Sequence, residues 1–499
     1  MGNGRQYCVS SAHPLATKAG MSVLRAGGNA VDAAIAISYM LGVVEPYASG
    51  IGGGGVMLIL PADGRDPIVC DYREVAPMSG VISQEEVGVP GFVKGMERVH
   101  QLFGTMDIGT IMNPAIMAAE EGVPTGEALQ RQLGQAQHLV VERFPELFPG
   151  GTALRAGELL KQPLLAQTMR DVRDRGSVAF YEGDGARHIS AAIEGMTEED
   201  FREYRVSVKK PIYSEYDSYD VITSPPPFGG VTLVQALKIS EAIHLHKHPS
   251  DSMPYIHQWG EIIGKCYALR KTTMGDPDFC DPPVQRMLSK ELIELLAASV
   301  NPDGLSQAPT TLDDVANTTH FVVSDGEGMC VSVTNTIGGF FGPGIGMGGF
   351  FLNNQLRNFT NDDSSPNVPQ PGKRPQSYVC PTILRSDKQT IVIGSAGGKR
   401  IPMTLSIILQ NVVKRQTGIE EALAIPRFFI DQNVVYTENR LPLEVQQSLV
   451  GLGYEVIYNP DPMFYGGVHG LMVTHETGSV SGAADPRRGG SSEVSGMEQ

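Results

Sequence analysis

Two threonines, Thr318 and Thr336, lie at the outer ends of two β-rich runs that flank a Gly-Glu-Gly segment at residues 326–328. This pattern predicts a β-hairpin with a three-residue loop. If Asp325 pairs with Met329 across that loop, Thr318 lies directly opposite Thr336, with their Cβ atoms roughly 5 Å apart. A slip of one residue would turn Thr336 to the other face of the sheet, so the prediction of two facing hydroxyls depends on this register.

A threonine at the start of a strand is usually only a good β-former, but the segment before Thr318 suggests a chemical role. Residues 301–317 are polar, acidic and interrupted by prolines, so we expect a mobile segment where the chain can be cut. Cleavage between Asn317 and Thr318 would give Thr318 a free α-amine, with a reference pKa of about 7.7 to 8.0. Such an amine can act as the base that activates the adjacent hydroxyl as a nucleophile.

Several sequence blocks resemble, in the same order, those of the γ-glutamyltransferases, which are self-cleaving N-terminal-nucleophile hydrolases. Blocks that resemble the start of the small subunit lie at residues 318–321, 334–336 and 341–344. Blocks that match the large-subunit pattern lie at residues 27–34, 72–74, 88–91 and 226–230. The similarity covers nearly the whole chain. We expect Thr318 to be the nucleophile and Thr336 to orient it by donating a hydrogen bond to its hydroxyl.

The predicted elements fit an α+β fold. Helices are predicted at residues 14–26, 30–44, 107–121, 157–175, 253–273 and 403–414, within a mostly helical region from 105 to 300. Strands are predicted at residues 56–60, on both sides of 326–328, at 389–393, and as a hairpin at 470–475 and 479–483, before a polar tail after 487. Two groups of strands with helices to cover both, together with the resemblance, imply a four-layer αββα sandwich of the N-terminal-nucleophile hydrolase type. The resemblance also implies a large-subunit segment, 1–317, and a small-subunit segment, 318–499, intertwined in one domain.

The composition is that of a soluble globule, and its charge disfavours two classes of partner. A formal net charge of −16 argues against nucleic acid and anionic membrane surfaces. Residues 1–6 lack the apolar core of a secretory signal, and the apolar run at 33–44 is too short to span a bilayer. We expect either an intracellular protein or one whose leader is absent from this sequence. Members of the resembled family are commonly extracytoplasmic, so the compartment stays open.

No metal or cofactor is expected. The six cysteines, at 8, 70, 266, 280, 330 and 380, lack the CxxC spacing of metal sites and are sparse for a disulfide scaffold. The glycines at 52–55 follow a predicted helix and open a strand, whereas those of a nucleotide-binding loop follow a strand and open a helix. They therefore indicate close backbone packing.

Attack of a hydroxyl on an amide carbonyl creates an oxyanion that needs prepositioned hydrogen-bond donors. Gly397 and Gly398 lie between a predicted strand and a predicted helix, where backbone N–H groups point toward an anion. Two glycines in a turn are usually structural, but the Gly-Ser-Ala-Gly-Gly run at 394–398 resembles the oxyanion loop of the family.

A guanidinium is the best bidentate partner for the α-carboxylate of a γ-glutamyl donor. Arg73 matches the carboxylate-binding arginine of the family, although an arginine flanked by two acids is also typical of a surface ion pair. Four cations near the glycine loop in sequence order are expected to form a basic cluster for an acidic substrate: Lys373, Arg374, Lys399 and Arg400.

Three positions depart from the pattern of glutathione-cleaving family members. The Asn-Asn-Gln run that ends at Gln355 is intact, but Asn358 replaces the aspartate that binds the free α-amine of the donor. The serine pair that helps to hold the carboxylate is here Gln376 and Ser377, and Gly338 replaces a polar contact. A donor whose α-nitrogen is already acylated, as in a poly-γ-glutamate chain, would not need the missing charge. The chain looks most similar to the capsule poly-γ-glutamate depolymerase branch of the family.

The sequence therefore predicts an autoprocessed γ-glutamyl transferase or hydrolase that works through a γ-glutamyl-threonyl ester. Its expected partners are a small or oligomeric γ-glutamyl donor, water or an amine as acceptor, and its own two fragments as a heterodimer. Its expected substrate-binding residues are Arg73, Gln355, Asn358, Ser377 and Arg400. Three alternatives stay open: a glutathione-type hydrolase or transpeptidase, a cephalosporin-acylase-like amidase, and a catalytically silent binding protein on the same fold.

Overall fold

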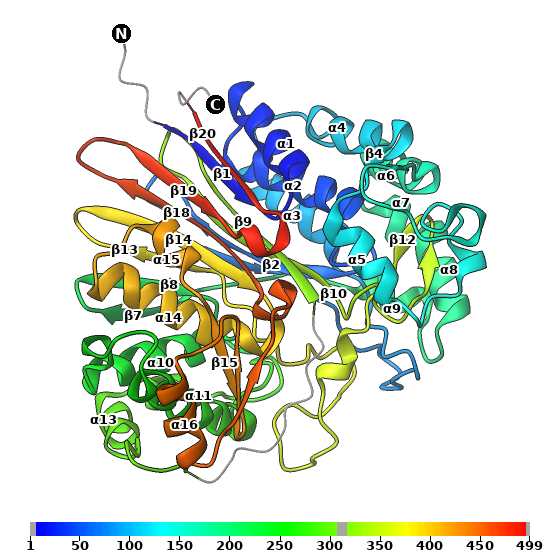
Figure 1. Ribbon diagram of the computed structural model, residues 1–499. Coiled ribbons are helices and arrows are strands. Elements are labelled where there is room, and N and C mark those ends of the chain that lie inside the picture. The colour runs from blue at the N-terminus through cyan, green and yellow to red at the C-terminus, as the bar shows by residue number, and fades with distance from the viewer. Residues whose placement is uncertain (1–5, 307–316, 496–499) are drawn as a thin grey trace.

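In the computed structural model, which describes residues 6–306 and 317–495, two antiparallel β-sheets lie face to face between layers of helices (Figure 1). The first sheet has the strand order β20 (Ser491–Val494), β1 (Cys8–Ser11), β9 (Asn317–Ser324), β10 (Cys330–Gly338), β2 (Gly54–Leu60), β3 (Ile68–Asp71) and β6 (Ser207–Lys209). The second has the order β19 (Val480–Ala484), β18 (Gly467–Thr474), β14 (Gln389–Ala396), β13 (Thr382–Arg385), β8 (Tyr219–Thr223) and β7 (Ile212–Tyr216). The predicted four-layer αββα sandwich is confirmed.

Helices cover the outer face of each sheet. Those on the first sheet include α1 (Pro14–Arg25), α2 (Ala30–Val44) and α3 (Phe92–Phe103), and α4 (Ile108–Glu121) packs on α2. Those on the side of the second sheet include α10 (Gly230–Ala242), α11 (Met253–Thr273), α14 (Ile401–Lys414) and α15 (Ile419–Ala424). A small sheet of β15 (Phe428–Asp431), β16 (Val434–Thr437) and β17 (Glu455–Tyr458) packs with α11 and α16 (Leu443–Gly451).

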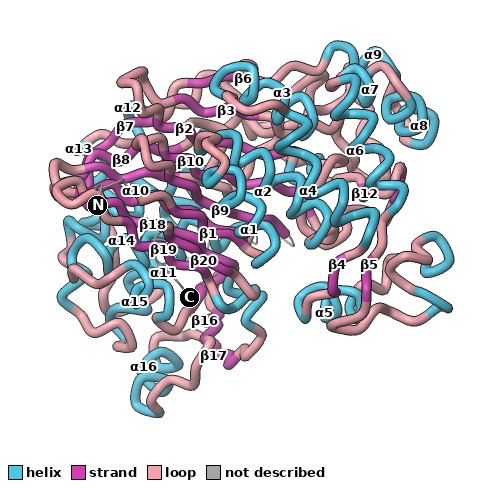
Figure 2. Tube along the Cα trace, turned by 90° about the horizontal axis from the view of Figure 1, so that it is seen from above, coloured by secondary structure: helices cyan, strands magenta, loops and turns pink. Residues whose placement is uncertain are grey.

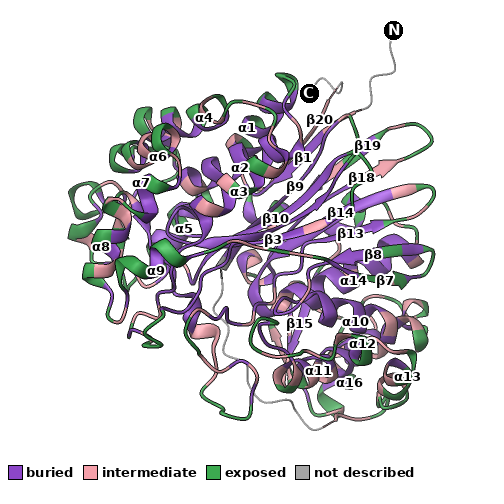
Figure 3. Ribbon diagram, turned by 180° about the vertical axis from the view of Figure 1, so that it is seen from behind, coloured by how far each residue is buried: buried purple, intermediate pink, exposed green. Residues whose placement is uncertain are grey.

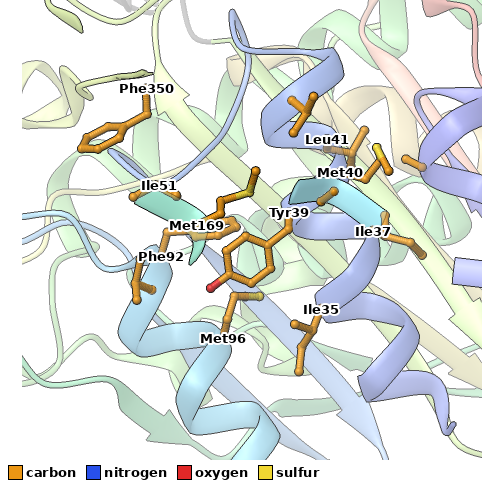
Figure 4. Close-up of a cluster of buried hydrophobic side chains, with 14 of the residues drawn as sticks. Ile35, Ile37, Tyr39, Met40, Leu41, Ile51, Phe92, Met96, Met169 and Phe350 are labelled. Atoms are coloured by element: carbon orange, nitrogen blue, oxygen red, sulfur yellow. The ribbon is translucent and has the colours of Figure 1, made fainter. Parts of the chain in front are cut away.

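Strand β2 shows how the layers are held together, because all seven of its residues are buried. Successive side chains of a strand point to opposite faces. Val56 and Leu58 accordingly join the core between the sheets, while Met57 and Ile59 join the core under the first helix layer. Burial follows this arrangement across the molecule, with buried strands at the centre and exposed outer helix faces (Figure 3). In the helix-side core, Tyr39 packs edge-on against Phe92 with ring centroids 5.3 Å apart (Figure 4).

Several element boundaries differ from the prediction. Helices α2 and α11 have the predicted bounds, but the helix predicted at 157–175 begins only at Pro163, as α6 (Pro163–Arg175). The preceding β5 (Leu159–Leu160) pairs with β4 (Val123–Pro124), and with α5 (Glu127–Gln135) they form a lobe that projects from the body (Figure 2). The region from 105 to 300 is also less helical than predicted, because β6, β7 and β8 complete both sheets. The polar tail after 487 contributes strand β20, which pairs with β1.

Both sheets combine strands from either side of the predicted cleavage position between residues 317 and 318. In the first sheet, β9 and β10 lie between β1 and β2. In the second, β13 and β14 lie between β8 and β18. The segments 1–317 and 318–499 therefore share both sheets. Residues 307–316, which make up most of the segment that the sequence predicts to be mobile, lie outside the described residues.

Candidate active site

The β9–β10 hairpin has the register that its loop predicts. Asp325 N donates a hydrogen bond to Met329 O at 3.0 Å, and residues 319–324 pair with 330–335 in the expected order. The side chain of Asp325 reinforces the loop, because its Oδ1 accepts hydrogen bonds from the backbone N–H groups of the three residues before the second strand resumes at 330.

The register changes at the end of the hairpin where the two threonines lie. Asn317 pairs with Gly338, so the described ladder contains an irregularity at the position predicted to pair Thr318 with Thr336. A bulge of this kind inserts an extra residue and bends the strand. Thr336 keeps its ladder position against Gly54 of β2 on its other side. Both threonines are 3% exposed, and the predicted direct cross-strand pair is replaced by a bulge.

A buried charged network supports the start of β9. Arg488 Nη1 donates to the carbonyl oxygen of Thr318 at 3.2 Å. The next residue, Thr319, donates through Oγ1 to Glu45 Oε2 at 2.8 Å, and Tyr47 OH donates to Glu45 Oε1 at 2.7 Å. Burial raises the pKa of Glu45, while these hydrogen bonds and the charge of Arg488 act against that rise. Sequence reasoning missed Glu45, Tyr47 and Arg488, although an acid in the apolar stretch after α2 was a signal.

A chain of polar side chains runs from Thr336 to the 3₁₀ turn η4 (Gln355–Asn358). Thr336 Oγ1 accepts hydrogen bonds from Gly338 N at 2.9 Å and from Gln355 Nε2 at 3.2 Å. Gln355 Oε1 in turn accepts from Asn358 Nδ2 at 3.0 Å. The structure thus brings together three residues that the sequence singled out separately.

The two glycines of the predicted oxyanion loop follow the end of β14. Gly397 and Gly398 have φ values of +131° and +57°, which L side chains rarely adopt. The chain then makes a 3₁₀ turn, η5 (Gly398–Arg400), before α14 begins at Ile401 rather than at the predicted residue 403. The requirement for glycine at this turn is therefore conformational.

Strand pairing and Arg488 connect this glycine turn to Thr318. Ala396, the residue before Gly397, pairs with Gly467 of β18. A β-carbon added to Gly467 would lie 2.8 Å from Arg488 Cδ, and Arg488 also binds the Thr318 carbonyl. Gly467, which pairs with the residue before the glycine turn, and the candidate nucleophile therefore contact the same arginine from different sheets.

Arg73 follows β3 and is 1% exposed. Its Nη1 donates to Pro375 O at 2.8 Å, its guanidinium lies 4.3 Å from the ring centroid of Phe228, and its Nε lies 3.5 Å from Asp71 Oδ1. Its Nη2 makes no hydrogen bond within the described part of the chain. A β-carbon added to Gly54 would lie 2.8 Å from Arg73 Cα. Because Gly54 pairs with Thr336, Arg73 lies beside the hairpin end.

Ser377 lies in the loop that packs around Arg73. Its N–H donates to Pro227 O at 3.0 Å, and its own carbonyl accepts from Arg270 Nη2 at 2.6 Å. Arg270 also donates to Phe228 O, the residue on which Arg73 stacks. Buried Arg270 thus holds the backbone of this loop.

Each of the four cations of the predicted basic cluster, at residues 373, 374, 399 and 400, has contacts of its own. Lys373 donates to the Pro366 carbonyl, and Arg374 pairs with Asp71. Lys399 pairs with Asp431, and the Arg400 guanidinium lies over the Phe464 ring at 4.7 Å. Both Lys399 and Arg400 also lie about 6 Å from the centroid of the Phe429 ring, at 6.0 and 5.9 Å. Lys373, Arg374 and Lys399 are thus bound to a carbonyl or carboxylate of another segment, and a basic cluster of all four cations stays a prediction. Arg400 still follows the glycine turn directly.

Over residues 6–306 and 317–495, no group of three or more His, Cys, Asp or Glu side chains could hold a metal ion. The six cysteines are free. No helix in these ranges is long and apolar enough to cross a membrane.

Comparison with known proteins identifies the family. The model of the γ-glutamyltranspeptidase family matches residues 16–495. The chain belongs to this family. It is 40% identical over 491 residues to the capsule biosynthesis protein CapD proenzyme of Bacillus anthracis, covering 98% of this chain and 91% of that protein. It is 33% identical over 539 residues to the glutathione hydrolase proenzyme of Bacillus subtilis (strain 168), with coverages of 98% and 91%.

A solved structure matches this γ-glutamyltranspeptidase-family chain over its whole length. The cephalosporin acylase of Bacillus halodurans superposes with a TM-score of 0.87 at 26% identity, covering 98% of this chain and 96% of that one. The fold is therefore of the N-terminal-nucleophile hydrolase type, and the family is one of enzymes.

Glu74, next to Arg73, is a buried acid with no hydrogen bond to either carboxylate oxygen within the described residues. It is 1% exposed, and burial raises its pKa from an ordinary 4.5 to about 8. A raised pKa in the folded state stabilises the fold at low pH. This contribution is full below the pKa of the unfolded chain and is lost as the pH rises toward 8.

We therefore expect Glu74→Gln to gain stability relative to wild type as the pH rises from 5 to 8.5. Each pH unit in this window changes the difference in unfolding free energy by at most about 1.4 kcal/mol, because only wild type must keep a proton on a buried carboxyl. Urea unfolding at several pH values measures the difference. The control is Glu476→Gln, an exposed acid in the β18–β19 turn. A difference for Glu74→Gln that does not vary with pH would contradict the prediction.

Proposed function

We propose that this protein cuts itself between Asn317 and Thr318 and then transfers γ-glutamyl groups through an ester on Thr318. The observation that carries the proposal is the hairpin end, where Thr318, the second residue of β9, is buried and Arg488 binds its carbonyl oxygen. Membership of the γ-glutamyltranspeptidase family and the proenzyme relatives support it.

In the proposed reaction, the freed α-amine of Thr318 takes the proton of the Thr318 hydroxyl, and Oγ1 attacks the γ-carbonyl carbon of the donor. The backbone N–H groups of Gly397 and Gly398 stabilise the oxyanion. The amine leaving group departs with a proton, which leaves the γ-glutamyl-threonyl ester. Water or an acceptor amine then attacks the ester and regenerates the hydroxyl. Thr336, hydrogen-bonded to Gln355, orients the nucleophile.

The donor is proposed to bind between Arg73 and the η4 turn. The unused Nη2 of Arg73 is a buried donor suited to the α-carboxylate, with Ser377 and Arg400 completing this side. Asn358 uses Nδ2 to bind Gln355, and its Oδ1 can accept a hydrogen bond from the α-nitrogen of the donor. This neutral oxygen suits an amide N–H, so we propose N-acylated or poly-γ-glutamyl donors as the preferred class.

The two fragments, 1–317 and 318–499, are proposed to stay together as a heterodimer after cleavage. Each sheet contains strands of both fragments, which pair where β1 meets β9 and β20 and where β10 meets β2 in the first sheet, and where β13 meets β8 in the second. Separating the fragments would therefore break strand pairs in both sheets. The acceptor would be water or an amine.

An amidase with another acyl preference is the second candidate. It is favoured by the whole-length structural match to a cephalosporin acylase. Turnover of a glutaryl amide with little response to a γ-glutamyl amide would select it. A silent binding protein would turn over neither.

Self-cleavage can be tested on a denaturing gel. Purified wild type is expected to give two bands on a denaturing gel, corresponding to residues 1–317 and 318–499, and N-terminal sequencing of the smaller should begin Thr-Thr-His-Phe. Thr318→Ala should give one intact band and no hydrolysis of γ-glutamyl-p-nitroanilide, because it lacks the attacking hydroxyl. Thr272→Ala, an exposed hydroxyl on α11, serves as control and should cleave normally. Intact wild type after long incubation would refute self-cleavage.

A substitution at Asn358 tests how the site binds the α-nitrogen of the donor. Asn358→Asp places a carboxylate beside it, and a charge-assisted hydrogen bond is worth about 1.5–3 kcal/mol, or roughly tenfold to a hundredfold in specificity. We expect the ratio of kcat/KM for glutathione over an N-acyl-γ-glutamyl donor to rise by about that factor. Wild type should prefer the N-acyl donor. If wild type prefers glutathione, the proposed preference for N-acylated or poly-γ-glutamyl donors is wrong, while the proposed γ-glutamyl transfer still holds.

A further inference from the structure

Arg357 is a partly exposed arginine within η4, between Gln355 and Asn358. Its guanidinium makes no hydrogen bond and no ion pair within 4 Å to any described residue. This is unusual in a chain with a formal net charge of −16, where other arginines of this region are paired with carboxylates or stacked on rings.

The guanidinium lies at the hairpin end. A β-carbon added to Gly339 would be 3.6 Å from Arg357 Nη1. Gly339 directly follows β10, and its N–H donates to Asn354 Oδ1 at 2.8 Å. Arg357 therefore points its charge toward the segment that follows Thr336, on the side where Asn358 binds Gln355.

The acid that faces Arg357 is Glu86. The charge of Arg357 acts to lower the pKa of Glu86, against the larger effect of burial, which raises it. The backbone of the two segments is joined, since Leu356 N donates to Glu86 O at 3.0 Å. The Glu86 carboxylate nevertheless stays beyond ion-pair distance of Arg357. The guanidinium keeps its bidentate donor edge for an external anion.

We propose that Arg357 binds the α-carboxylate of the glutamyl unit attached to the α-nitrogen of the donor. This inference rests on the proposed function. In a γ-linked chain, the donor nitrogen forms an amide with the γ-carbonyl of the next unit, and that unit carries its own α-carboxylate a few bonds further. Asn358 takes the neutral amide, and Arg357, one residue earlier in the same turn, takes the carboxylate beyond it. The proposed site therefore binds at least two consecutive γ-glutamyl units of the donor.

Three p-nitroanilide donors separate this role from general catalysis: γ-glutamyl, N-acetyl-γ-glutamyl and γ-glutamyl-γ-glutamyl. Only the third carries the second carboxylate. Arg357→Gln is expected to lower kcat/KM for the two-unit donor about tenfold or more, mainly through KM, and to change the N-acetyl donor less than about twofold. The wild-type advantage of the two-unit donor should shrink as salt is raised, because the contact is partly exposed.

Two further variants act as controls. Arg357→Lys keeps the charge without the planar fork, so it should recover part of the lost specificity. Arg385→Gln removes an exposed arginine at the end of β13 and should leave all three donors unchanged. Turnover of the N-acetyl donor by Arg357→Gln also shows that this variant is folded and processed.

The outcomes distinguish the inference from the function on which it rests. A selective loss for the two-unit donor supports the role of Arg357. Equal losses for all donors, or no loss for any, would overturn that role while the γ-glutamyl activity stands. If wild type hydrolyses none of the three donors, the proposed function and the inference fail together.

Discussion

The pairing of β9 with β10 is the constraint on which the rest of the site depends. Its register follows from one tight loop, in which Asp325 binds Met329 and accepts three backbone hydrogen bonds. Because the two strands lie inside a sheet that is covered on both faces, a slip by one residue would exchange buried faces along the whole hairpin. The register of the β9–β10 ladder changes at the bulge at its far end. The proposed nucleophile Thr318 and its neighbour Thr336 lie at this bulge.

Around this hairpin end, buried charges are held by partners from distant segments. Burial acts to raise the pKa of Asp71, yet Lys209, Arg73 and Arg374 together hold it below its usual range. Because three cations share one carboxylate, some of their N–H groups find no acceptor there. Within the described residues, Nη2 of Arg73 is such a group. Removing Asp71 would leave these buried cations without their shared counter-charge, and breaking a buried ion pair costs about 3–5 kcal/mol. The ion pairs that position Arg73 therefore also stabilise the fold.

Local signals in the sequence predicted the local structure well. Asn29 and Asp32 form the capping box that starts α2, and Pro46 follows its end, so the predicted bounds 30–44 are confirmed. The loop at 326–328 predicted the hairpin register through residue 335. The grouping of Thr336, Gln355 and Asn358 also agrees with the family resemblance, while the roles of these residues stay predictions.

Features that depend on distant contacts could not be predicted in this way. The bulge arises where β10 also pairs with β2. The hairpin of β7 and β8 has no local cue to its place beside β13 of the second sheet. Glu45 and Arg488 are more than 400 residues apart in sequence and meet only in the folded protein. The partners of Arg374 and Lys399 could not be predicted for the same reason, since Asp71 and Asp431 come from other elements.

The central claim is that Thr318 carries the acyl group, and trapping that ester tests it most directly. The processed protein would be mixed with a γ-glutamyl donor, quenched in acid within the first turnovers, digested, and mapped by mass spectrometry. The account predicts one added γ-glutamyl group on the peptide that begins at Thr318, and none when the donor is omitted. Turnover with the acyl group on another residue, or with no covalent adduct under conditions where product release follows a burst, would contradict it.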